Sequence, residues 1–195
     1  VDIIAGNEAG RLVYLGVAAS LGAQDTAARL VVDIGSGSTE LVLGQGATIR
    51  RIESFAVGAV RQSLTFFPDG RLDATGFDAA VRSSRSRFAE ARLGVPRWQQ
   101  AYGACGTVRA LAEIAQLHGE EGLLRRADLE RLRADFIGIG HVAGVRQAYP
   151  AAERASHLPG GLAILIGLME ELDIAELVAV QAGLRVGALW DLHQR

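Results

Sequence analysis

Hydrophobic positions along this chain follow two spacings, which separate the expected helices from the expected strands. Short apolar or β-branched runs predict strands over residues 30–35, 39–43, 48–57, 99–104 and 177–181. Apolar positions three and four residues apart predict helices over residues 8–19, 75–88, 108–119, 128–136, 159–172 and 184–192. Residues 75–78 resemble a capping box, which predicts that the second helix begins there.

The order of these elements predicts an α/β fold. The first three strands are separated only by short turns, and the glycines at 44 and 46 predict a tight turn before the third strand. These strands are therefore expected to form an antiparallel meander. The later strands alternate with helices, which is typical of a mixed sheet covered by helices on both faces.

Composition agrees with a folded globular chain of modest size. The chain has 195 residues and a mass of 20.6 kDa, with 49% hydrophobic and 22% charged residues. Since a domain usually needs about 100–200 residues, one full domain and a fragment are expected. No pattern typical of a signal peptide occurs at residues 1–4, and the lack of an initiator Met indicates a chain cut from a longer one.

Charge and residue usage exclude several functions. The net charge of −2 and pI of about 6.1 give no support for nucleic acid or an anionic membrane as a partner. All 20 basic residues are Arg, which excludes Schiff-base lysine chemistry and the Walker-A lysine. The apolar stretch at residues 160–169 is shorter than the ~18 residues of a membrane span. A single cysteine, Cys105, excludes an internal disulfide and fits a reducing cytoplasm, where we expect the protein.

A first glycine turn follows the expected strand at residues 30–35. Asp33 ends this strand, and Glu40 follows seven residues later on the next one. Between them, small residues allow backbone N–H groups to approach phosphate oxygens, while the two carboxylates could hold Mg²⁺ or orient water. The alternative is an ordinary hairpin with small turn residues and two solvated acids.

A second glycine turn, at residues 103–109, joins an expected strand to an expected helix. The N–H groups and dipole at the start of such a helix favour an anion. Two turns of this kind in one sheet suggest one shared cleft. The alternative is simple capping of the helix by Thr107. Cys105 has no His near it in the sequence, so a small buried thiol is a simpler interpretation than a nucleophile.

Other familiar catalytic patterns do not occur. The four histidines, at residues 118, 141, 157 and 193, have no metal-ligand spacing and are interpreted as surface or capping residues. Neither HExxH nor GxSxG is present, so zinc peptidase and α/β-hydrolase functions have no support.

With both turns placed, the sequence resembles the exopolyphosphatase/guanosine pentaphosphate phosphohydrolase (Ppx/GppA) phosphatase family of the actin-like ATPase superfamily. The resemblance covers nearly the whole chain, in segments that follow the order of the family. These segments are residues 6–12, 14–17, 32–40, 58–61, 103–110, 158–161 and 183–185.

The resemblance implies a ribonuclease H-like fold and a site in the cleft between two such domains. Residues 1–28 would close the amino-terminal domain, the rest of which is absent, and residues 29–195 would form the carboxy-terminal domain. The implied reaction is Mg²⁺-dependent attack of water on a terminal phosphoanhydride, which releases orthophosphate from polyphosphate or guanosine pentaphosphate. A homodimer is common in the family.

The resemblance also implies roles for individual residues of this chain. Asp33 and Glu40 would be catalytic and would hold the metal, together with a catalytic carboxylate at Glu8. The first phosphate-binding set would be Gly35, Ser36, Gly37, Ser38, Thr39 and Arg61. The second phosphate or nucleotide turn would be Gly103, Cys105, Gly106 and Thr107.

Three positions depart from the family pattern. An ungapped comparison places the general-base glutamate of the family at Ala9, which leaves Glu8 as the carboxylate in that segment. Ser36 replaces a glycine, and Val186 replaces a glutamate. Because Ala9 cannot accept a proton, two alternatives stay open beside the hydrolase: a binding module for polyphosphate or a guanosine alarmone, and another ATPase or kinase of the superfamily.

Overall fold

A computed structural model describes residues 6–22, 26–93, 98–116, 122–149 and 157–194 of the chain. The strands are β1 (Ala28–Ile34), β2 (Thr39–Gln45), β3 (Thr48–Phe55), β4 (Gln100–Gly103), β5 (Leu123–Arg125) and β6 (Glu176–Ala179). The helices are α1 (Gly6–Leu21), α2 (Ala59–Phe66), α3 (Ala74–Phe88), α4 (Gly106–Gln116), α5 (Arg126–Ile139), α6 (Val142–Ala148), α7 (Leu158–Glu171) and α8 (Leu184–Gln194).

The six strands form one mixed sheet in the order β3-β2-β1-β4-β6-β5. Strands β1, β2 and β3 pair antiparallel, which confirms the predicted meander. Strands β4 and β6 run parallel to β1, and β5 closes the edge in the antiparallel direction. The predicted α/β class is therefore confirmed.

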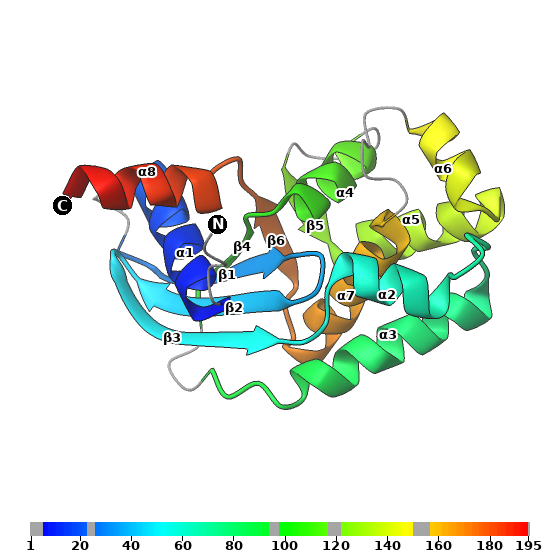
Figure 1. The fold of residues 1–195 in the computed structure, drawn as a ribbon, viewed down its shortest axis with the longest axis horizontal. Helices are drawn as coiled ribbons and strands as arrows, with labels where there is room; N and C mark the ends of the chain where they lie inside the picture. Colours follow the sequence, from blue (N-terminus) through cyan, green and yellow to red (C-terminus); the bar gives the residue numbers. More distant parts are fainter. Residues whose placement is uncertain (1–5, 23–25, 94–97, 117–121, 150–156, 195) are drawn as a thin grey trace, which may run out of the picture.

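Helices cover both faces of this sheet (Figure 1). On one face, α1 packs on the meander, where Val31 and Val42 contact its residues, and α8 packs against α1. On the other face, Leu30 and Val32 join a larger core with α2, α3, α4, α5 and α7. Helix α7 is buried along almost its whole length, as its apolar sequence predicts.

Helices α1 and α8 approach each other through glycine. A Cβ atom at Gly187 would overlap the carbonyl oxygen of Leu12, and one at Gly16 would reach the carbonyl oxygen of Gly183 at 2.5 Å. This close packing fixes the direction in which each residue of α1 points.

Three elements are absent from the sequence-based prediction: α2, β5 and α6. Helix α2 buries Ala59, Gln62 and Ser63 and leaves Leu64 exposed, so the apolar positions in its sequence do not mark the side that it buries. The Gln62 amide donates to the carbonyl of Ala80 at 2.7 Å and to Ser84 Oγ at 2.9 Å. Strand β5 has three residues and α6 has seven, which is too short for a periodic signal.

The predicted start of α3 was wrong, whereas His141, expected to be a surface or capping residue, does cap α6 by accepting from the N–H of Ala143. Helix α3 is capped by Asp73, whose side chain accepts from the N–H of Gly76 at 2.8 Å, because the chain is extended at Asp73 and already helical at residue 75. Thr107 lies inside α4, and its hydroxyl donates to the carbonyl of Ile34 at 3.4 Å. The predicted end of this helix at Gly119 lies outside the described residues. The predicted domain boundary at residue 28 stays a prediction.

Candidate active site

Asp33 and Glu40 lie directly opposite each other in the β1–β2 ladder. Side chains at opposed positions of a ladder share one face of the sheet. Because Val31 and Val42, two residues away on each strand, face α1, both carboxylates lie on the α1 face. The hairpin therefore places the two carboxylates together at the end of β1, as their spacing in the sequence suggested.

Glu40 is held in place from two sides. It is buried, and Ser54 Oγ on β3 donates to its Oε1 atom at 2.8 Å. Gly6 at the start of α1 lies so close that a Cβ atom there would be 3.2 Å from Oε1. The second oxygen, Oε2, accepts from none of the described residues, so it is left for a ligand.

Asp33 lines an open cavity of about 620 Å³. Burial, together with the negative charge of Glu40, raises the pKa of Asp33 to about 6, and the positive charge of Arg109 opposes this rise. A carboxyl with such a pKa changes its charge readily near neutral pH. A cation bound at this position would favour the ionised form.

The first glycine turn, residues 35–38, is braced by the start of α2. The N–H of Gly35 donates to the carbonyl of Ser38 at 2.9 Å. The N–H of Ala59 donates to the carbonyl of Gly35 at 2.9 Å, and those of Val60 and Arg61 donate to the carbonyl of Ser36 at 3.1 and 3.2 Å. The N–H groups at the start of α2 therefore hold the first glycine turn in place by donating hydrogen bonds to the carbonyl groups of the turn.

The free donors of this turn differ from those implied by the resemblance. Among the described residues, none accepts from the N–H groups of Ser36 and Ser38, so both can meet an anion. Thr39 is fully buried, and its hydroxyl donates to the carbonyl of Val57 at 2.6 Å. The Thr39 hydroxyl is thus used inside the protein. The guanidinium of Arg61 is exposed and reaches the carbonyl of Ala56 at 3.4 Å.

The second glycine turn contributes Cys105 and Gly106 to the cavity of Asp33. Gly103 lies in β4 instead, where a Cβ atom would clash with Val108 and Leu177, so it serves packing. Burial, with the nearby charge of Asp33, raises the pKa of the Cys105 thiol to about 11. A thiol with such a pKa is almost entirely protonated at neutral pH, which argues against a nucleophilic role for Cys105.

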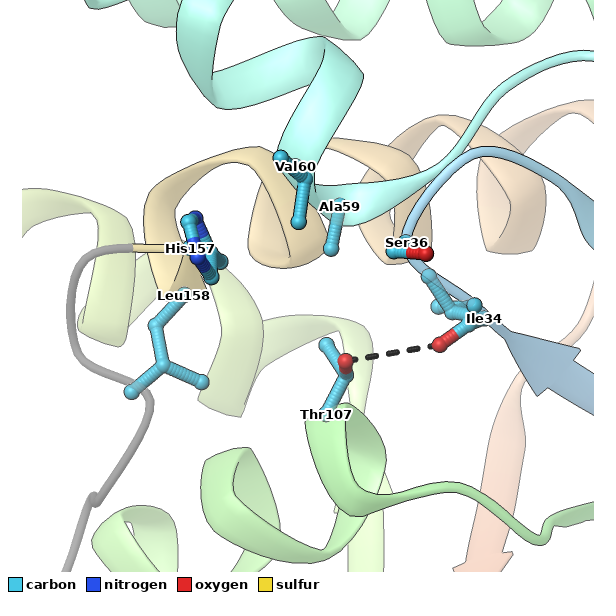
Figure 2. A pocket seen from close by; sticks show the side chains of 8 residues that line it. Ile34, Ser36, Ala59, Val60, Thr107, His157 and Leu158 are labelled. Carbon is cyan, nitrogen blue, oxygen red and sulfur yellow. Dashed lines mark hydrogen bonds between the residues drawn. The ribbon is translucent and has the colours of Figure 1, made fainter.

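Thr107 belongs to a second cavity of about 330 Å³ on the other side of the first glycine turn. Figure 2 shows Ile34, Ser36, Thr107 and His157 around this space, with the hydrogen bond from Thr107 to Ile34. The structure therefore separates Thr107 from the cavity that Asp33 lines.

Glu8 does not join the two carboxylates of the sheet. On the first turn of α1, its Oε1 and Oε2 atoms accept from Arg11 at 2.7 and 2.9 Å. Arg11 also donates to Asp191 of α8 at 2.9 Å. These two pairings, with that of Glu8 the larger, raise the pKa of Arg11 above its ordinary value. Glu8 is therefore engaged along the outer side of α1.

Ala9 occupies the side of α1 that faces the site. It shares a helix face with Gly6, Val13 and Gly16, which are three, four and seven residues away. Gly6 lies over Glu40, and Gly16 packs against Gly183, which lines the cavity of Asp33. Position 9 therefore points between Glu40 and this cavity, and it supplies only a methyl group.

Two further residues belong to the site and were absent from the predicted set. Arg109 lines the cavity and donates to the carbonyl of Gln181 at 3.4 Å. Its position near the start of the helix that follows the second glycine turn could have identified it as a site residue from the sequence. Ser54 supports Glu40 across the β2–β3 ladder, and no local motif marks it because the contact spans 14 residues.

The two carboxylates suit a hard divalent cation. No group of three His, Cys, Asp or Glu side chains able to hold a metal occurs among the described residues. Mg²⁺, however, is commonly bound by one or two carboxylates with water and substrate phosphates completing its shell. Asp33 at the cavity and the free Oε2 of Glu40 fit that donor set.

Comparisons with known proteins identify the family and the fold of this chain. Residues 1–195 match the Ppx/GppA phosphatase family. The fold is similar to a crystal structure of the Aquifex aeolicus family member, with 23% identity and a TM-score of 0.85 over 100% of this chain and 64% of that one. It is also similar to an exopolyphosphatase from Cytophaga hutchinsonii, with 22% identity and a TM-score of 0.82 over 100% of this chain and 65% of that one.

An exopolyphosphatase-like protein gives 25% identity and a TM-score of 0.84, over 100% of this chain and 68% of that one. This chain thus spans about two thirds of the length of these relatives. The shared architecture is the actin-like ATPase fold. None of the described helices is long and apolar enough to cross a membrane. On the match over its whole length, the chain belongs to the Ppx/GppA phosphatase family.

Proposed function

We propose that this chain carries one wall of a phosphoanhydride hydrolase site, which releases orthophosphate from inorganic polyphosphate or guanosine pentaphosphate. The observation that carries the proposal is the pairing of Asp33 with Glu40 beside both glycine turns. Acidic groups with backbone donors in the adjoining turns are what phosphoryl transfer needs, since its catalysis depends on positioning and charge stabilisation.

Anion contacts come from both turns. The N–H groups of Ser36 and Ser38 would bind phosphate oxygens at the rim of the site, since Gly35 of the same turn lines the cavity of Asp33 while Ser36 lines the second cavity. The start of α4, at Gly106, adds the positive end of a helix dipole from the other side of the cavity. Arg109, one turn further, would hold the next phosphate through its guanidinium.

Asp33 would orient the attacking water, because it is the carboxylate that lines the cavity. The oxygen of this water forms a new bond to the terminal phosphorus and its proton is released to solvent, while the bond from that phosphorus to the bridging oxygen breaks and its electron pair leaves with the bridging oxygen. Orthophosphate and a substrate one phosphate shorter leave. Glu40, fixed by Ser54, would keep a second carboxylate charge beside Asp33.

Mg²⁺ would be held by Asp33 and Glu40, where it would neutralise phosphate charge during the transfer. The raised pKa of Asp33 is consistent with this role, because two neighbouring carboxylates without a cation disfavour full ionisation.

A second candidate function is ligand binding without turnover. Position 9 faces the site but carries no carboxylate, and both carboxylate oxygens of Glu8 are bound by Arg11. A carboxylate bound in this way accepts a proton less readily because protonation breaks the ion pair. A protein with these features could retain the phosphate site and lack a proton acceptor.

Orthophosphate release from polyphosphate and from guanosine pentaphosphate, with Mg²⁺, tests both functions. The variants are Glu40→Gln and Ala9→Glu. The matched control is Glu53→Gln on β3, which removes the same charge next to Ser54 but on the other face of the sheet, where Glu53 pairs with Arg51.

Turnover by the wild-type protein that Glu40→Gln abolishes and Glu53→Gln preserves supports the hydrolase. Substrate binding without turnover, with turnover gained in Ala9→Glu, supports the binding module instead. Turnover unchanged in Glu40→Gln contradicts the assignment of the site.

A further inference from the structure

Helix α7 contacts the elements that hold both glycine turns. It is buried along almost its whole length and packs against α2, α3, α4 and α5. Figure 2 shows residues from the starts of α2, α4 and α7 around the cavity that Thr107 lines. A helix enclosed on so many sides is a rigid base, because close-packed interfaces transmit a displacement instead of absorbing it.

The contact between α7 and α2 fixes the first glycine turn. The N–H of Gly160 donates to Ser63 Oγ at 3.1 Å, and Ser63 Oγ donates to the carbonyl of His157 at 3.2 Å. A Cβ atom at Gly160 would lie 2.5 Å from Ser63 Oγ and would overlap the carbonyl oxygen of Ala59. The N–H of Ala59 donates to the carbonyl of Gly35. The first turn is therefore tied to α7 through the start of α2.

The contact between α7 and α4 fixes the second glycine turn. Thr107 directly follows Gly106, which lines the cavity of Asp33. A Cβ atom at Gly161 would overlap the Cγ2 methyl of Thr107, whereas Thr107 Cβ would be 3.6 Å away. On its other side, the Thr107 hydroxyl donates to the carbonyl of Ile34 at 3.4 Å. Thr107 is therefore held between α7 and the end of β1.

We propose that Gly161 and Thr107 are positioning residues that set the distance between the two glycine turns. Because α7 is tied to both turns, a change in the width of the contact between Gly161 and Thr107 moves one turn relative to the other. A ligand with one phosphate group meets a single turn and does not sense this distance. A ligand with two linked phosphate groups has a fixed span and senses it. This inference rests on the proposed function for the placement of successive phosphates at the two turns.

Moving one methyl group across this contact tests the inference. Gly161→Ala adds a methyl group, and Thr107→Ser removes Cγ2 but keeps the hydroxyl. The double variant has as many methyl groups at the contact as the wild-type protein. The probes are orthophosphate and methylenediphosphonate, whose two phosphonate groups are joined by carbon and cannot be hydrolysed. Calorimetry with Mg²⁺ gives both dissociation constants separately from turnover.

We expect Gly161→Ala to weaken methylenediphosphonate binding about ten-fold and orthophosphate binding less than about two-fold, because the overpacked contact displaces α4. Thr107→Ser should weaken methylenediphosphonate about three-fold, because the lost methyl group leaves a gap beside α7. The double variant should bind both ligands within about two-fold of the wild-type protein, since its contact has the original width. Simple destabilisation would not be reversed in this selective way.

Gly167→Ala is the matched control on the same helix. A Cβ atom there would lie 2.8 Å from Ser84 Cβ and 2.9 Å from the carbonyl oxygen of Val81, both on α3. No residue of α3 is among the described residues that line either cavity. Gly167→Ala should therefore lower the melting temperature and leave the ratio of the two dissociation constants unchanged.

Equal weakening of both ligands by Gly161→Ala, or a double variant that binds methylenediphosphonate as weakly as Gly161→Ala, overturns this inference. If Gly161→Ala does not fold, wild-type affinity in the double variant with weaker binding in Thr107→Ser supports the inference, and the reverse order overturns it.

Phosphate release from polyphosphate separates this inference from the proposed function. Release by the wild-type protein, with a ligand preference that no variant changes, leaves the hydrolase standing and overturns the positioning role. Selective loss and recovery of methylenediphosphonate binding without release from any substrate supports the positioning role and counts against hydrolysis. A wild-type protein that binds neither ligand overturns both.

Discussion

Asp33 lies directly opposite Glu40 across the β1–β2 ladder, and both side chains occupy the face that α1 covers. Two carboxylates at opposed positions repel each other when both are ionised. Burial is the larger cause of the rise in the pKa of Asp33 to about 6, and repulsion by Glu40 adds to it.

The raised pKa of Asp33 predicts a specific pH dependence of stability. Its ordinary pKa is 3.8, so between about pH 4 and 6 the folded protein binds a proton that the unfolded chain releases. The free energy of unfolding should therefore fall as pH rises through this range. Asp33→Asn removes the ionisation and should stabilise the protein by about 1–3 kcal/mol at pH 7, with no gain below pH 4.

Urea denaturation from pH 4 to pH 8 measures this difference. Asp69→Asn is the control, because Asp69 is exposed on the turn that follows α2. If the free energy of unfolding differs by the same amount between Asp33→Asn and the wild-type protein across the whole pH range, the pKa of Asp33 is not raised in the folded protein.

The hydrogen bond from Ser54 to Glu40 predicts a positioning role for Ser54. Ser54→Ala removes the donor at 2.8 Å and frees the Glu40 side chain to turn. We expect about a ten-fold loss in kcat for phosphate release with little change in KM, and a loss of about 1 kcal/mol in stability. Ser54→Thr keeps the hydroxyl and should restore most of kcat. If Ser54→Thr is as impaired as Ser54→Ala, the hydroxyl is not the cause.

The contact of Gly58 with the first glycine turn predicts that Gly58→Ala lowers the stability of the protein far more than Gly37→Ala does. A Cβ atom at Gly58 would come to 2.5 Å from the carbonyl carbon of Ser36, and backbone atoms there cannot yield. Gly58→Ala should therefore destabilise the protein by about 1–3 kcal/mol and weaken phosphate binding. Gly37→Ala is the matched control, because no atom lies within 4 Å of a Cβ there. Equal stability of the two variants in thermal unfolding would argue against the docking of α2 on the turn.

The burial of Cys105 predicts an inert thiol. With a pKa of about 11, only about one thiol in a thousand is ionised at pH 8. Labelling with a chromogenic disulfide reagent should be slow in the native protein and rapid in denaturant. Rapid labelling of the native protein would show that Cys105 is exposed and would reopen a nucleophilic role.

Much of the fold follows from patterns that are local in the chain. The strand at residues 28–34 is a continuous apolar run, and α7 is apolar all round, so each is recognisable without its neighbours. Helix α2 is the opposite case. Its buried Gln62 and Ser63 make sense only once the backbone of α3 and α7 is in place to receive their hydrogen bonds.

In the candidate site too, some features follow from local sequence patterns and others depend on contacts between distant segments. The seven-residue spacing of Asp33 and Glu40 around small turn residues predicted their pairing, because a hairpin returns the chain to its own start. The donor to Glu40, the separation of Thr107 from the cavity and the outward direction of Glu8 depend on contacts with β3, Ile34 and Arg11.

Local sequence patterns were enough to predict the order of the strands in the meander, the glycine turns and the family to which the chain belongs. The groups of those turns that face the cavity, and the contributions of Arg109 and Ser54, became clear from the folded structure alone. The difference arises from the distance along the chain over which each interaction acts. Hydrophobic period and turn chemistry act over a few residues, whereas the direction of a side chain at the site is set by packing between segments far apart in the chain.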